Sequence, residues 1–124
     1  MSKKLVTTKV LEGGIRRYTL ANDVKTPETQ YAAKLKRHFG VPSKESLHLL
    51  DCSQIRTIGP DIFKAILEIH KRLASRKHRL AISAGDNTRR YLEYRQNFNP
   101  KGIVDVYLTE EQAIRELRAE AARR

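Results

Sequence analysis

Apolar residues along the chain follow two alternating spacings, which predict alternating strands and helices. Two runs rich in β-branched residues, 4–12 and 15–21, flank Gly13-Gly14, an arrangement typical of a β-hairpin. Strand character returns at 47–52, 79–84 and 103–108. Between and after these runs, apolar residues recur every three or four positions, which is the spacing of one helix face. It predicts helices from Glu28 to near Gly40, over 62–74, over 88–98 and from Thr109 to about Ala121.

Local signals mark where these helices begin. Thr26, Pro27 and Glu28 supply a hydroxyl N-cap, a proline at the first position and an acid in the first turn. Thr109 and Gln112 fit a capping box. The stretch IRTIGPDIF, residues 55–63, is interpreted as an apolar strand that breaks at Gly59-Pro60 and restarts as an amphipathic helix.

The predicted order of elements is therefore β-β-α-β-α-β-α-β-α, within one domain that spans residues 1–124. Strands that alternate with helices indicate the α/β class, with a mixed β-sheet layered by about four helices. In such folds ligands and partners meet the protein at the carboxyl ends of the strands. The loop around Gly59 lies at one of these ends.

Composition places the chain among globular proteins, with 40% hydrophobic and 31% charged residues. No apolar run approaches the roughly 20 residues of a transmembrane helix, and the first residues have no apolar signal segment. Cys52 is the only cysteine, which excludes an internal disulfide and favours the reducing cytoplasm.

The net charge of +11 changes this picture, because it makes an acidic partner, nucleic acid or an anionic membrane surface plausible. The densest basic stretches are 71–79 and 88–95. The alternative interpretation is that these charges only solvate helix faces. If they bind anions, the candidate residues are Lys71, Arg72, Arg76, Lys77, Arg79, Arg89 and Arg90.

Motifs for catalysis and cofactors are missing from the sequence. It contains no glycine-rich nucleotide cradle and no nucleophile elbow, and Ser83 at a strand end has no such context. The four histidines and Cys52 lack metal-ligand spacing. We therefore expect no enzyme, no cofactor and no metal site.

From Leu47 onward the order of residues resembles the STAS domain family of bacterial anti-sigma-factor antagonists. Asp51 and Ser53 match the family's D-x-S, and Ile55 and Ile58 match its apolar positions before the switch loop. The segment 88–114 is similar to the family's third helix, last strand and closing helix. The resemblance implies a non-catalytic regulatory module that binds proteins, with an anti-sigma-factor kinase as the usual partner.

The switch loop itself departs from the family pattern D-S-S-G, in which a serine or threonine is phosphorylated. Gly59, Pro60, Asp61 and Ile62 occupy the four positions, so no phosphoacceptor is expected there. Asp61 would place one permanent negative charge at the start of a helix, where phosphoserine would carry about −1.5 to −2. The alternative is that Pro60 and Asp61 are only favourable helix-start residues.

Three functions follow from these observations. The first is a protein-binding module of the STAS type, whose partner-binding residues are Thr57, Gly59, Pro60, Asp61, Ile62 and Lys64. The second is a basic adaptor for nucleic acid or anionic lipid. The third is a self-assembling or accessory subunit of a larger assembly, such as a stressosome-like shell or a lipid-transport complex, since STAS domains occur in both.

Overall fold

The computed structural model describes residues 5–22, 25–40, 43–56, 58–97 and 104–123. In chain order its elements are β1 (Val6–Leu11), β2 (Ile15–Leu20), α1 (Glu28–Gly40), β3 (Leu47–Asp51), α2 (Pro60–Ser75), β4 (Arg79–Ser83), α3 (Asp86–Asn97), β5 (Asp105–Tyr107) and α4 (Glu110–Ala122). This order confirms the predicted succession of strands and helices and the α/β class.

All five strands join one sheet in the order β1-β2-β3-β4-β5. The first two strands are antiparallel, and β2 to β5 run parallel to one another. The turn of the β1–β2 hairpin lies at Gly13 and Gly14, whose φ angles of 90° and 78° are in the left-handed region that glycine adopts without strain. The predicted hairpin and the mixed sheet are both confirmed.

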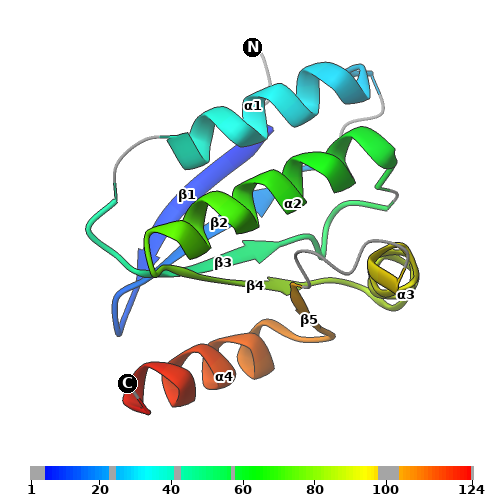
Figure 1. Cartoon of the computed structure of the whole chain (residues 1–124). Coiled ribbons are helices and arrows are strands. Elements are labelled where there is room, and N and C mark those ends of the chain that lie inside the picture. The colour runs from blue at the N-terminus through cyan, green and yellow to red at the C-terminus, as the bar shows by residue number, and fades with distance from the viewer. Residues whose placement is uncertain (1–4, 23–24, 41–42, 57, 98–103, 124) are drawn as a thin grey trace.

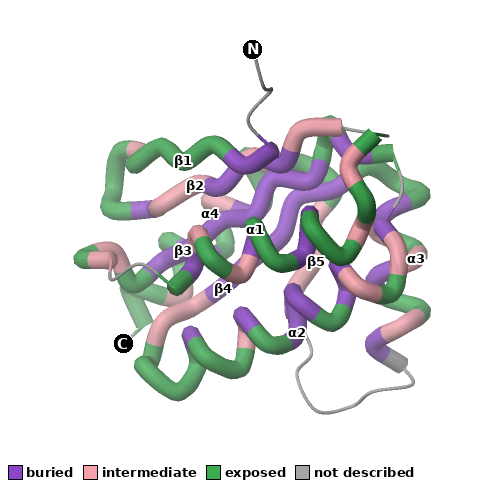
Figure 2. Tube along the Cα trace, turned by 90° about the horizontal axis from the view of Figure 1, so that it is seen from above, coloured by how far each residue is buried: buried purple, intermediate pink, exposed green. Residues whose placement is uncertain are grey.

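Helices cover the two faces of the sheet unequally (Figure 1). The helices α1, α2 and α3 pack on one face, where they contribute Leu35, Ile66 and Leu92 to the main apolar core. On the other face α4 packs alone, with Ala113 and Leu117 against a smaller apolar cluster of strand residues. The central strand β3 is buried over its whole length, between these two layers (Figure 2). Because β3 is covered on both faces, nearly all of its successive residues are apolar.

The described residues between β3 and Gly59, 52–56 and 58, form a loop and no strand, so the prediction of an apolar strand there is wrong. Strand β3 ends at Asp51, whose Oδ1 accepts a hydrogen bond of 2.9 Å from the backbone N–H of Ser53 and closes a turn. Ile55 and Ile58 are nevertheless buried in the main core. Apolar residues anchor this loop to the core without pairing in the sheet, and the apolar pattern alone does not distinguish the two cases.

Three further boundaries and positions differ from prediction. Helix α3 begins at Asp86, two residues early, and the Arg89 N–H donates to the Gly85 carbonyl at 2.8 Å, as a helical bond does. Strand β5 is limited to three residues, and part of the expected 103–108 strand lies outside the described residues. Ala121, expected on the apolar side of the last helix, is exposed.

Candidate partner-binding surfaces

The start of α2 follows the carboxyl end of β3, which is the edge of the sheet where the sequence placed a binding loop. Pro60 is the first helical residue, as predicted, and Asp61 lies in the first turn. Gly59 is the N-cap residue with φ −94° and ψ −174°, and it has no side chain with which to cap the helix. The first backbone N–H groups of α2 therefore need an acceptor from elsewhere.

That acceptor is Glu28, the first residue of α1. Its Oε1 accepts a hydrogen bond of 3.1 Å from the backbone N–H of Ile62, across 34 residues of sequence. A Cβ atom at position 59 would lie under 3.0 Å from both carboxylate oxygens of Glu28. A side chain at position 59 would therefore displace the Glu28 carboxylate, whereas the φ of Gly59 suits any residue. The sequence assigned Glu28 only to the first turn of its own helix.

Asp61 lies in the first turn of α2 as predicted, but it does not cap the helix. It is half-buried, and its carboxylate makes no hydrogen bond within the described part of the chain. Glu28 holds the backbone N–H, while Asp61 adds a second negative charge near the positive end of the helix dipole. Two carboxylates, from α1 and α2, therefore occupy the start of α2.

The other residues predicted to bind a partner divide by exposure. Pro60 and Lys64 are exposed and Gly59 is half-buried, so these three reach the surface together with Asp61. Ile62 is only 4% exposed and packs in the main core, as Phe63 does. The assignment of Ile62 as a partner contact is corrected, because it lies on the helix face turned to the sheet. Thr57 lies outside the described residues.

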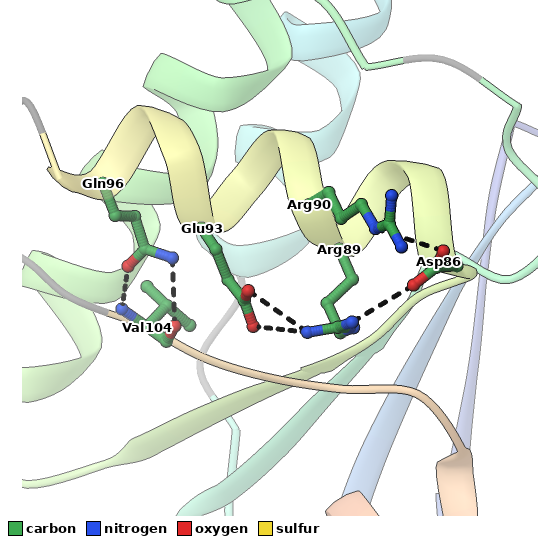
Figure 3. A network of polar contacts seen from close by, with 6 residues as sticks. All are labelled: Asp86, Arg89, Arg90, Glu93, Gln96 and Val104. Atoms are coloured by element: carbon green, nitrogen blue, oxygen red, sulfur yellow. Dashed lines mark hydrogen bonds and ion pairs between the residues drawn. The ribbon is translucent and has the colours of Figure 1, made fainter.

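Three of the seven predicted anion-binding residues are engaged in ion pairs. Arg79, at the start of β4, pairs with Asp105 and with Glu120 of α4, the latter at 2.7 Å. On α3, Arg89 pairs with Asp86 and Glu93, and Arg90 pairs with Asp86 at 3.2 Å (Figure 3). Neighbouring acids hold all three arginines. Arg89 and Arg90 lie on α3, whereas Arg79 lines a pocket together with Lys77, so the structure does not bring the seven together.

The four remaining candidates are exposed: Lys71 and Arg72 lie near the carboxyl end of α2, and Arg76 and Lys77 follow it. Here the structure adds two cations that the sequence analysis missed, Lys36 and Arg37 of α1. A groove of about 550 Å³ between the helices is lined by Ala33, Lys36, Arg37, Gly40, Glu68 and Arg72. A signal was available, because Lys36 and Arg37 lie in the gap of the apolar stripe between Leu35 and Phe39. Which helix they would meet was not readable from the sequence.

His48 and His78 form a hydrogen-bonded pair, in which His48 is buried and His78 is half-buried. His48 is 1% exposed; its Nδ1 shares a hydrogen bond of 3.0 Å with the Tyr18 hydroxyl, and its Nε2 shares one of 3.0 Å with Nδ1 of His78. Burial lowers the pKa of His48 to about 4 and raises the pKa of Tyr18 to about 12. Both groups stay neutral near pH 7, which suits a role in packing.

Other reactive groups in the described part of the chain are enclosed. Cys52 is fully buried, and burial raises the pKa of its thiol, so the nucleophilic thiolate is disfavoured. The hydroxyl of Ser83 is buried and donates to Asp51 Oδ1 at 3.3 Å. Over the described ranges, no group of three His, Cys, Asp or Glu residues is arranged to hold a metal ion. None of the helices described there is long and apolar enough to cross a membrane.

Comparison with known proteins gives matches in structure but not in sequence. No protein-family model matches the chain, and a search of curated proteins finds no relative. An anti-sigma factor antagonist from Mycobacterium paratuberculosis superposes with a TM-score of 0.70 at 16% identity, over 91% of this chain and 94% of that one. A variant of RsbS from Moorella thermoacetica gives 0.72 at 10% identity, over 96% and 99%. A Thermotoga maritima protein gives 0.68 at 19%, over 91% and 94%. The chain thus has the fold of anti-sigma-factor antagonists, the STAS fold that its residues resembled.

Proposed function

We propose that the chain is a non-catalytic regulatory module that binds a protein partner through the start of α2. The observation that carries this proposal is the pair of carboxylates there. Glu28 holds the Ile62 N–H, and Asp61 lies beside it, where a family switch loop would present a serine. The surface offered to the partner comprises Gly59, Pro60, Asp61 and Lys64.

In this proposal the loop has one permanent state. A phosphate on a serine at this helix start would bind the free N–H groups and be stabilised by the helix dipole. Here an internal carboxylate already accepts one of those N–H groups, and the residues at 59–62 have no hydroxyl to modify. Binding is therefore constitutive rather than switched by phosphorylation, and a cytosolic protein related to anti-sigma-factor kinases is the partner class that we propose.

Affinity capture from the native cell, followed by mass spectrometry, tests this proposal. We expect Asp61→Ser and Lys64→Glu each to reduce capture of the main protein partner at least about tenfold. The matched control is Arg115→Glu, an exposed position on α4 on the opposite face of the sheet, which should capture normally. Capture that is unchanged in both loop variants would contradict the assignment of this surface.

The function as a subunit of a larger assembly remains a prediction. Sedimentation of the purified chain across a range of concentrations tests it directly. A monomer at all concentrations would contradict a self-assembling shell, whereas a large particle would favour it over the single-partner proposal.

A further inference from the structure

Helices α1 and α2 lie side by side and run in the same direction (Figures 1 and 2). Three contacts along them fix this alignment. Glu28 meets the N–H of Ile62, Lys36 pairs with Glu68 at 3.2 Å, and Gly40 lines the same groove as Arg72. The two helices therefore begin together at one end of the molecule and finish together at the other.

This alignment gathers positive charge at the carboxyl ends of the pair. Basic residues are favoured in the last turn of a helix because they interact with the negative end of its dipole. Arg37 lies in the last turn of α1 and Arg72 in the last turn of α2. Since the helices are parallel, both last turns face the same groove, and exposed Lys71 and Arg76 extend the positive surface along α2.

Most of this charge is not neutralised within the protein. Of the groove's three cations, Lys36 is paired with Glu68, the one carboxylate in the lining. Arg37 and Arg72 make no ion pair within the described residues. Each guanidinium offers a planar set of donors that suits a carboxylate. The groove thus presents two arginines without ion pairs, Arg37 from α1 and Arg72 from α2, beside the paired Lys36 and Glu68.

Single-stranded nucleic acid and anionic membranes both fit this groove poorly. Single-stranded nucleic acid is usually bound by aromatic platforms, and none of the described residues that line the groove is aromatic. Insertion of a helix face into a membrane surface needs exposed apolar side chains beside the cations. The large hydrophobic residues exposed in the described structure are Val10, Tyr94 and Leu108, and none of them lies on α1 or α2.

We propose that the α1–α2 groove binds an acidic polypeptide segment, with side-chain carboxylates paired to Arg37 and Arg72. A groove of about 550 Å³ accommodates a few side chains. Its residue Arg72 lies about 16.5 Å along α2 from Asp61, for 11 residues at 1.5 Å each. The groove is therefore a second surface, separate from the one in the proposed function, and each surface can fail its test without the other.

Fluorescence anisotropy with a labelled peptide of alternating Glu and Ala tests the proposal, with the Gln counterpart as reference. We expect the Glu peptide to bind at least tenfold more tightly than the Gln peptide at low salt. The double variant Arg37→Glu/Arg72→Glu should lose at least tenfold in affinity. The control Lys9→Glu/Arg115→Glu, which makes the same change in net charge at exposed positions away from the groove, should lose less than threefold.

Equal losses in the two double variants would overturn the proposal, since they would show attraction to net charge alone. Binding of a DNA duplex and of vesicles containing phosphatidylserine is measured in the same way. If either probe binds more tightly than the Glu peptide and loses binding in the groove variant, the groove is a polyanion site and the proposal is wrong. Arg37→Gln/Arg72→Gln provides a second variant that keeps the helix ends free of new acids, and circular dichroism checks the fold of each.

Discussion

Helices α2 and α4 meet the same backbone requirement in opposite ways. At the start of α4 the Thr109 side chain accepts a hydrogen bond of 3.1 Å from the Gln112 N–H, so the cap lies within four consecutive residues. At the start of α2 the N-cap is Gly59, and the acceptor is Glu28 of another helix. One helix start is specified locally, whereas the other is complete only when α1 is docked beside it.

This difference explains how the loop at the start of α2 is held in place. Because α2 lacks a local cap, its first turn is coupled to the position of α1, and any displacement of α1 leaves the Ile62 N–H without its acceptor. The α4 start has no such dependence on a distant residue. The surface that we propose for partner binding is therefore built on a contact between two helices, rather than on one loop.

The largest loss of stability is expected from a substitution at Ile62, where the start of α2 enters the core. Ile62→Ala should lower the free energy of unfolding by about 2–5 kcal/mol, the usual range for removing a buried isoleucine side chain. The matched substitution near the α4 start, Ile114→Ala, should cost less, because Ile114 is only partly buried. Urea unfolding measures both values. Equal costs would show that the two helix starts do not differ in their attachment to the core.

The next largest loss of stability is expected from substitutions at Gly59 and Glu28, which lie together at the start of α2. Gly59→Ala and Glu28→Ala should each cost about 1–2 kcal/mol, because each removes the same carboxylate cap. In the Glu28→Ala background Gly59→Ala should cost less, since the three atoms nearest to the added methyl group all belong to the Glu28 carboxyl group. Thermal or urea unfolding of the four proteins completes this cycle. Additive losses would contradict the remote cap.

The smallest loss of stability is expected at Thr109, the local cap of α4. Thr109→Ala should cost about 1 kcal/mol through loss of its hydrogen bond to the Gln112 N–H. The cost should be the same in the wild-type and Glu28→Ala backgrounds, because the two sites share no partner. Urea unfolding of the two pairs compares these costs. A cost that depends on Glu28 would show that the two helix starts are coupled through the sheet, and the contrast between them would fail.

Prediction from the sequence succeeded where a structural signal is carried by neighbouring residues. Gly13-Gly14 predicts the hairpin because a tight turn needs positive φ angles, and Thr109 with Gln112 predicts the start of α4. It failed at Ile55 and Ile58, since a buried apolar side chain can belong to a loop as well as to a strand. It also placed Ile62 at a surface, although the helical spacing turns it toward the sheet.

By itself, the sequence determined the order of strands and helices, the hairpin and the local cap of α4, because periodicity, turns and caps depend on residues close in the chain. Tertiary structure alone decided that Glu28 caps α2 and that Arg79 is neutralised by Asp105 and Glu120. It also decided that Arg37 and Arg72 face one groove. These are contacts between residues far apart in sequence, and only the packing of helices on the sheet brings them within hydrogen-bonding or ion-pair distance.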